Sequence, residues 1–114
     1  MTQEQMLKLV ESQERAYNAR DLEAFCQCFH PEIEIQRLIS GIGSKGIEKF
    51  REGFQQLFSS SPNLHSKIKS RIVLEFTIID EEWITGATNF PKGLHTVAIY
   101  GFRDGLIDRV WFPR

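Results

Sequence analysis

The sequence predicts an α+β fold in which three N-terminal helices pack against a cone-shaped, curved antiparallel sheet. Apolar residues recur at helical spacing only in the segments that precede Ser59. From Lys67 onward, apolar and polar residues alternate in runs that are joined by tight turns, as in strands. Helices followed by an antiparallel meander are typical of the α+β class. The 114 residues fit one domain, spanning 1–114.

Two helices are expected at the start of the chain. Thr2 and Gln5 form a capping-box pattern, which predicts a helix from Thr2 to Ala19. Asp21 is a good N-cap for a short second helix. His30-Pro31 closes this second helix, because the residue before a proline avoids helical angles.

A strand and a third helix follow. Inward-facing Ile33, Ile35, Arg37 and Ile39 alternate with their neighbours, which predicts a strand. Gly41-Ile42-Gly43-Ser44 is expected to be a turn, with Ser44 as the N-cap of a helix that runs to about Phe58.

The rest of the chain is predicted to form two hairpins. Strands Arg71 to Ile79 and Glu82 to Asn89 flank Asp80-Glu81, and strands 94–103 and 106–112 flank Asp104-Gly105. Residues directly opposite each other share a face of the sheet, so an Asp80-Glu81 turn pairs Ile78 with Trp83. This register places on the concave face Ile72, Leu74, Phe76, Ile78, Trp83, Thr85, Ala87, Asn89, Leu94, Thr96, Ala98, Tyr100 and Phe102. It leaves on the convex face an apolar patch of Val73, Ile79, Ile84, Val97 and Ile99, which predicts a homodimer formed through that face.

Two registers are open for the last hairpin. A three-residue loop, Arg103-Asp104-Gly105, points Asp108 into the cone, where it would be the counter-ion of Arg37. A two-residue loop, Asp104-Gly105, points Arg109 and Trp111 inward instead. We favour the first register, because it gives Arg37 an anion.

Composition excludes several classes of protein. Fourteen Lys and Arg balance fifteen Asp and Glu, so no cationic surface for nucleic acid is expected. No apolar run approaches the ~20 residues that span a bilayer, and the N-terminus lacks the pattern of a secretion signal, so we expect a cytoplasmic protein with no membrane partner. Cys26 and Cys28 match neither a disulfide nor a zinc pattern, so no metal or other cofactor is expected.

Four segments carry a resemblance to a known family: Tyr17 to Phe25, Phe29 to Glu32, Gly46 to Phe50, and Phe102 to Ile107. In their order and spacing, the chain resembles the nuclear transport factor 2-like superfamily, in its SnoaL-like and ketosteroid-isomerase-like branch. The resemblance implies a cystatin-like fold with a small-molecule pocket. It specifies architecture and not reaction, because this fold hosts many activities.

The family's isomerase residues are not present. Arg37 stands where ketosteroid isomerases have a carboxylate base, and Gln13 and Ala98 stand where they have two oxyanion donors. A guanidinium stays charged and cannot act as that base. Ketosteroid isomerisation by the family mechanism is therefore not expected. Epoxide hydrolysis would need an inward aspartate in addition to Asp108, and the sequence shows none.

The candidate catalytic residues are Arg37, Asp108 and Tyr17. Strand parity points Arg37 inward, where it would bind a carboxylate, a phosphate or an enolate, or would reach water at the strand end. The predicted pocket lining is Tyr17, Arg37, Phe50, Phe76, Trp83, Tyr100 and Asp108.

Two functions stay open. One is a small-molecule pocket protein: an isomerase, cyclase or hydrolase of a small apolar carbonyl or carboxylate compound. The other is a non-catalytic ligand-binding or dimeric association module whose interior is filled by its own side chains. A cavity of several hundred cubic ångströms would favour the first.

Overall fold

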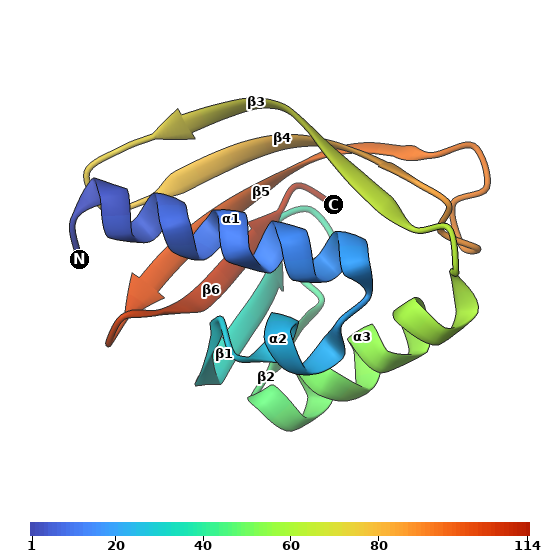
Figure 1. The fold of residues 1–114 in the computed structure, drawn as a ribbon, viewed down its shortest axis with the longest axis horizontal. Helices are drawn as coiled ribbons and strands as arrows, with labels where there is room; N and C mark the ends of the chain where they lie inside the picture. The colour runs from blue at the N-terminus through green and yellow to red at the C-terminus, as the bar shows by residue number, and fades with distance from the viewer.

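A computed structural model describes all residues from 1 to 114 and contains three helices and six strands (Figure 1). The helices are α1 (Gln3–Ala19), α2 (Leu22–Cys26) and α3 (Ile47–Ser60). The strands are β1 (Phe29–Arg37), β2 (Gly43–Lys45), β3 (His65–Val73), β4 (Ile78–Thr85), β5 (Leu94–Arg103) and β6 (Leu106–Phe112). These elements confirm the predicted α+β class. The six strands form one sheet in the order β2-β1-β6-β5-β4-β3, in which only β1 and β6 run parallel, so the sheet is mixed and not wholly antiparallel.

The first two helices begin where the sequence predicts. The Thr2 hydroxyl accepts a hydrogen bond from the backbone N–H of Gln5, whose side chain accepts one from the N–H of Thr2. Asp21 caps α2 by accepting a hydrogen bond from the N–H of Ala24. The His30-Pro31 pair lies inside β1 and not between a helix and a strand, because α2 already ends at Cys26.

The segment between β1 and α3 differs from the prediction. Gly43 to Lys45 are not a turn but the short strand β2, which pairs antiparallel with β1. Ser44 lies in this strand, so it does not cap α3; the N-cap is Gly46, whose backbone N–H donates to the carbonyl of Ile33. The predicted capping pattern was therefore wrong, and helix and strand are instead joined directly at a glycine.

The β3–β4 hairpin turns at Leu74 to Thr77, not at Asp80-Glu81 as predicted. Val73 pairs with Ile78, and Arg71 with Asp80. Relative to the prediction, this register exchanges the two faces of β4 beyond Ile78. Asp80 and Glu82 now lie on the inner, concave face, and Trp83 lies on the outer, convex face.

The last hairpin adopts the two-residue turn that we did not favour. Asp104 and Gly105 both have positive φ angles, 55° and 77°, and Arg103 pairs with Leu106. Gly101 then pairs with Arg109, so Asp108 is the extra residue of a β-bulge. The bulge restores the inward orientation of Val110, which is buried opposite Tyr100.

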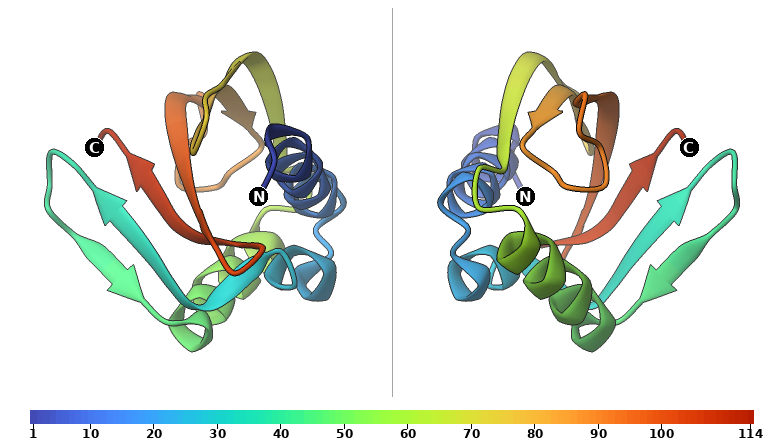
Figure 2. Two further views of the ribbon diagram at one scale, coloured as in Figure 1. Left: turned by 90° about the vertical axis from the view of Figure 1, so that its left-hand side faces the viewer. Right: turned by 90° about the vertical axis from the view of Figure 1, so that its right-hand side faces the viewer.

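The strongly curved sheet wraps around the helices. Figure 2 shows that α1 lies against the concave side of β3 and β4, while α3 lies below β1 and β2 at an angle to α1. The core between these layers includes Met6, Val10, Phe25, Ile33, Ile78 and Ile107. No helix is long and apolar enough to cross a membrane.

Candidate functional site

A cavity of about 740 Å³ opens between the helices and the concave face of the sheet. One wall is aromatic, because α1, α2, β1 and α3 direct their ring-bearing positions to the same side. The rings of Phe29 and Phe50 lie 4.4 Å apart, and those of Phe25 and Phe54 lie 4.8 Å apart. Such an apolar chamber fits the size range of small-molecule sites.

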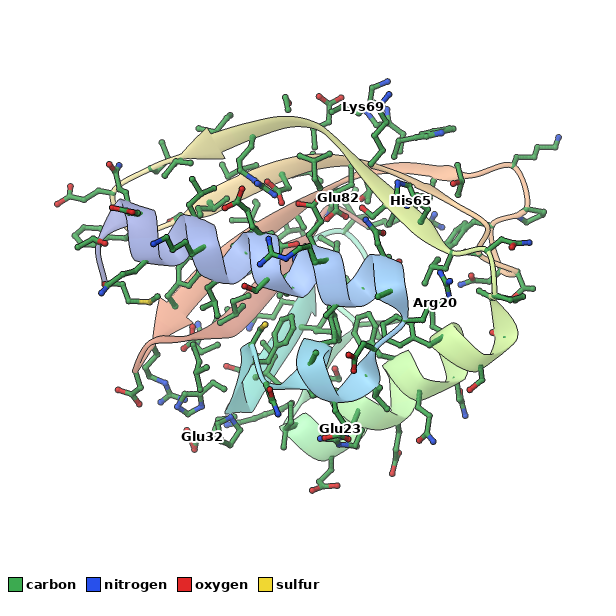
Figure 3. The ribbon with its side chains drawn as sticks, in the orientation of Figure 1. Arg20, Glu23, Glu32, His65, Lys69 and Glu82 are labelled. Carbon is green, nitrogen blue, oxygen red and sulfur yellow. The ribbon has the colours of Figure 1, made fainter.

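The inner end of the cavity, which we call the floor, is polar. It is lined by buried side chains of Gln13, Ser66, Glu82, Thr96 and Tyr100. Glu82 is only 8% exposed and lies between β4 and α1, whereas Lys69 of β3 points away from the helices (Figure 3). The Tyr100 hydroxyl donates to Glu82 Oε1 at 3.4 Å and accepts from Gln13 Nε2 at 3.2 Å.

Burial dominates the electrostatics of the floor. Desolvation, helped by the nearby charge of Asp80, raises the pKa of Glu82 to about 7. The hydrogen bond from Tyr100 opposes this rise but does not cancel it. Desolvation and the proximity of Glu82 raise the pKa values of the Tyr17 and Tyr100 phenols, so both stay protonated at neutral pH.

An ion-pair cluster of Arg71, Asp80 and Glu14 lies close to Glu82. The guanidinium of Arg71 donates to both oxygens of Asp80, at 2.6 and 2.9 Å, and to Glu14 Oε1 at 3.0 Å. Asp80 is fully buried, and this bidentate pairing compensates for the burial of its charge. Glu82 has no cationic partner of its own.

Several polar groups that face the cavity have no protein partner. The Ser66 hydroxyl is buried and makes no hydrogen bond. The Tyr17 hydroxyl also makes no hydrogen bond. Its ring packs against that of Phe58, with 5.6 Å between the ring centroids. At the solvent-exposed end, which we call the mouth, Arg37, Lys49 and Arg114 line the cavity without an ion pair.

The structure brings four of the predicted pocket residues together. Tyr17, Arg37, Phe50 and Tyr100 all line the cavity. Arg37 lies on the inner face, as strand parity predicted, and its guanidinium sits 5.3 Å from the centroid of the Phe112 ring. No carboxylate lies close enough to form an ion pair with Arg37, and its side chain is exposed to solvent at the mouth.

Three predicted pocket residues lie elsewhere. Phe76 is in the β3–β4 turn and 75% exposed, and Trp83 is on the convex face beside His95. Both errors follow from the misplaced turn. Asp108 does not pair with Arg37; it lies in the β6 bulge, with Arg103 Nε 3.4 Å from its Oδ2.

Glu82 is not among the residues predicted from the sequence, because a turn at Asp80-Glu81 assigns it to the convex face. A signal for the correct register was present. A connection through Leu74 to Thr77 places Arg71 opposite Asp80, and opposite charges stabilise directly facing positions on neighbouring strands.

The comparisons with known proteins agree with this geometry. The family model of the SnoaL-like domain matches residues 10–110. Similar solved structures include an uncharacterised cystatin-fold protein of Novosphingobium aromaticivorans, with 24% identity and a TM-score of 0.84 over 100% of this chain and 99% of that one. A putative ketosteroid isomerase of Kribbella flavida shares 17% identity, with a TM-score of 0.83 over 100% and 82% of the two chains.

A putative polyketide cyclase of Sinorhizobium meliloti shares 15% identity, with a TM-score of 0.78 over 92% of this chain and 93% of that one. No curated protein matches the chain. At these identities the solved structures show the fold, and the family model covers most of the sequence. The chain is a member of the SnoaL-like family, with the cystatin-like, nuclear transport factor 2-like fold.

Proposed function

We propose that this protein is an acid–base enzyme for a small, largely apolar carbonyl compound, with Glu82 as the group that moves the proton. The observation that carries the proposal is a single side chain. Glu82 is a buried carboxylate at the polar floor of a cavity whose wall is aromatic, with a pKa of about 7. A general base is most effective when its pKa is close to the pH at which it works.

The residues around Glu82 suit a proton transfer next to a carbonyl group. Ionised Glu82 would take a proton from the carbon beside the carbonyl, and the electron pair of that C–H bond would pass to the carbonyl oxygen. Tyr17 stays protonated and would donate a hydrogen bond to the resulting enolate oxygen. Where a carbon–carbon double bond lies next to the deprotonated carbon, return of the proton from Glu82 to the far end of that bond moves the double bond into conjugation and completes an isomerisation. Where the substrate has a second carbonyl, attack of the enolate carbon on it closes a ring, and the resulting alkoxide takes the proton from Glu82.

The other candidates take supporting roles in this proposal. Tyr100 already bonds Gln13 and Glu82, so it holds the carboxylate and is not free for a substrate. Arg37 lies at the exposed mouth, so it would contact the substrate away from the reacting carbon. The similar structures named as a putative ketosteroid isomerase and a putative polyketide cyclase fit the same reaction class.

The second candidate is a ligand-binding module without catalysis. The open cavity favours it as well, because a purely structural association module would fill that space with its own side chains. Glu82, which is buried and has no cationic partner, favours the enzyme over the carrier. A carrier of apolar ligands gains nothing from a carboxylate that is costly to bury.

Deuterium exchange tests the proposal without knowledge of the natural substrate. Purified protein would be mixed with indanone, a small bicyclic ketone, in deuterated buffer at pH values on both sides of 7, and exchange beside the carbonyl would be followed by proton NMR. We expect an accelerated rate that rises as Glu82 ionises, and a loss of about a hundredfold in Glu82→Gln.

Glu75→Gln is the matched control, because Glu75 lies exposed in the β3–β4 turn. It should exchange indanone protons at the wild-type rate. Equal rates in the wild type and Glu82→Gln would contradict the enzymatic proposal and favour the carrier.

A further inference from the structure

The charged groups that line the cavity are divided between its two ends. At the floor, Glu82 is buried, and nearby Glu14 is bound by Arg71. At the mouth, Arg37, Lys49 and Arg114 are exposed, and none of the three forms an ion pair. The mouth is therefore cationic, although the whole chain has a net charge of only −1.

Arg37 is one of four arginines in this chain that form no ion pair, together with Arg15, Arg20 and Arg114. Four others are bound by carboxylates: Arg51, Arg71, Arg103 and Arg109. Arg109 offers the direct comparison, because it lies across the sheet from Glu34 of β1, on the outer face, and pairs with it at 3.1 Å. Arg37 lies on β1, the strand of Glu34, but faces the cavity, where no acidic side chain reaches it.

The position of Arg37 is set by its neighbours. Parallel pairing of β1 with β6 brings it beside Phe112, whose ring centroid lies 5.3 Å from the guanidinium carbon. This cation–π contact orients the guanidinium and leaves its N–H groups without an acceptor. A planar guanidinium with free N–H groups matches a carboxylate, which it can bind through two parallel hydrogen bonds.

We propose that the substrate of this cavity carries a carboxylate, which Arg37 binds at the mouth with Lys49 contributing a second positive charge. The inference deepens the proposed function and rests on it, because it treats the cavity as a substrate site. It names the substrate class: an apolar acid with a carbonyl group at the opposite end.

Electrostatics fix the order of the groups along such a substrate. A carboxylate close to Glu82 would place two negative charges in a desolvated space, which is unfavourable. Binding at the mouth keeps the substrate's charge away from Glu82 and near solvent. The apolar segment then lies along Phe50 and Phe54, and the far carbonyl reaches the floor, where Tyr17 and Ser66 have unused hydroxyls.

Binding of two matched probes tests this inference. Naphthaleneacetate and naphthaleneethanol share a ring system and differ in the charge of the head group. Isothermal titration calorimetry would measure the affinity of both for the wild type, Arg37→Gln and Lys49→Gln. We expect the wild type to prefer the acid by about tenfold or more, Arg37→Gln to lose most of that preference, and Lys49→Gln to lose a smaller part of it, with the affinity for the alcohol unchanged in both variants.

Two controls carry the same loss of charge outside the cavity. Arg15 and Lys8 are exposed on α1, so Arg15→Gln and Lys8→Gln should keep the preference for the acid. Added salt should weaken binding of the acid and not of the alcohol. Equal wild-type affinity for the two probes, no binding of the acid at millimolar concentration, or an unchanged preference in Arg37→Gln would overturn the inference.

The same titrations in Glu82→Gln separate this inference from the proposed function. A preference for the acid that persists in a variant without catalysis supports the binding assignment by itself. Loss of the preference in Arg37→Gln, together with normal exchange in the Glu82→Gln variant, would uphold the substrate class and contradict the role of Glu82.

Discussion

Two carboxylates on the inner face of β4 are treated differently by their surroundings. Asp80 receives two hydrogen bonds from the guanidinium of Arg71, and this pairing stabilises its buried charge. Glu82, two residues later, accepts only one hydrogen bond, from the phenol of Tyr100, and lies near the negative charge of Asp80. Its ionised form is therefore destabilised, and the same burial that lowers the stability of the fold gives Glu82 a pKa suited to proton transfer.

This arrangement predicts how the stability of the protein depends on pH. The pKa of Glu82 rises from 4.5 to about 7 on folding, so the folded state binds more protons than the unfolded state between these values. The free energy of unfolding should therefore fall as the pH rises through this window. Glu82→Gln should not show this decrease. Above pH 7, its free energy of unfolding should exceed that of the wild type by on the order of 3 kcal/mol.

Urea denaturation of both proteins from pH 4.5 to above 7 measures this difference. Other titrating groups are common to both, so subtraction isolates Glu82. Glu75→Gln, which alters an exposed carboxyl group, should follow the wild type at every pH. A difference in the free energy of unfolding between Glu82→Gln and the wild type that stays constant across the window would show that folding does not raise the pKa of Glu82.

At the scale of single elements, the helices and β1 could be predicted because their signals are local. The Thr2 and Gln5 capping box, the Asp21 cap and the inward alternation of Ile33, Ile35 and Arg37 each depend on residues within one element. The pocket residues that the sequence placed correctly belong to these elements or to β5, whose inner residues Thr96, Ala98 and Tyr100 are buried as expected.

Hairpin register was harder to predict, because one residue of error moves every later side chain to the other face. The acidic pair Asp80-Glu81 resembled a turn, while the true connection, Leu74 to Thr77, contains apolar residues that looked like strand. The error hid Glu82 and misplaced Trp83. In the last hairpin the wrong turn was favoured, yet the bulge at Asp108 still directed Val110 inward.

The connection after β4 depends on a glycine that no other residue can replace without movement. Gly86 has a φ of 79°, and a Cβ there would lie 2.1 Å from the carbonyl oxygen of Asn63. The segment that follows supplies Ala87, Asn89 and Phe90 to the cavity. Close approach of two backbones therefore sets one side of the site.

We expect Gly86→Ala to be much more destabilising than Gly41→Ala. Gly41 has a similar φ of 72° but nothing within 4 Å of its Cβ position, so alanine there costs only the left-handed conformation, about 1 kcal/mol. Gly86→Ala adds the clash with Asn63, which should cost about 1–3 kcal/mol more. Urea denaturation midpoints measure both, and equal losses would contradict the close approach.

At the scale of the whole molecule, the sheet uses its two faces for different purposes. The concave face closes around the cavity. On the convex face, cross-strand pairing aligns Ile72, Ile79, Ile99 and Trp111 in one row over four strands. Val73 and Ile84, which we had expected in the convex patch, lie on the inner face; Ile72, Trp83 and Trp111 take their place outside.

The row predicts that the protein is a homodimer formed through the convex face. Ile72 is 52% exposed, and a contiguous apolar row of this kind is unfavourable in water unless a partner covers it. A second copy supplies the same row, so the two faces can pack isologously about a two-fold axis.

Light scattering should give twice the 13.2 kDa chain mass for the wild type. Ile99→Glu, which places a charge in the middle of the row, should give the monomer mass, with circular dichroism confirming that it stays folded. Ile42→Glu changes an equally apolar residue that is exposed in the β1–β2 turn, and should remain dimeric. A wild-type species of 13.2 kDa at every concentration would show that the convex face stays uncovered.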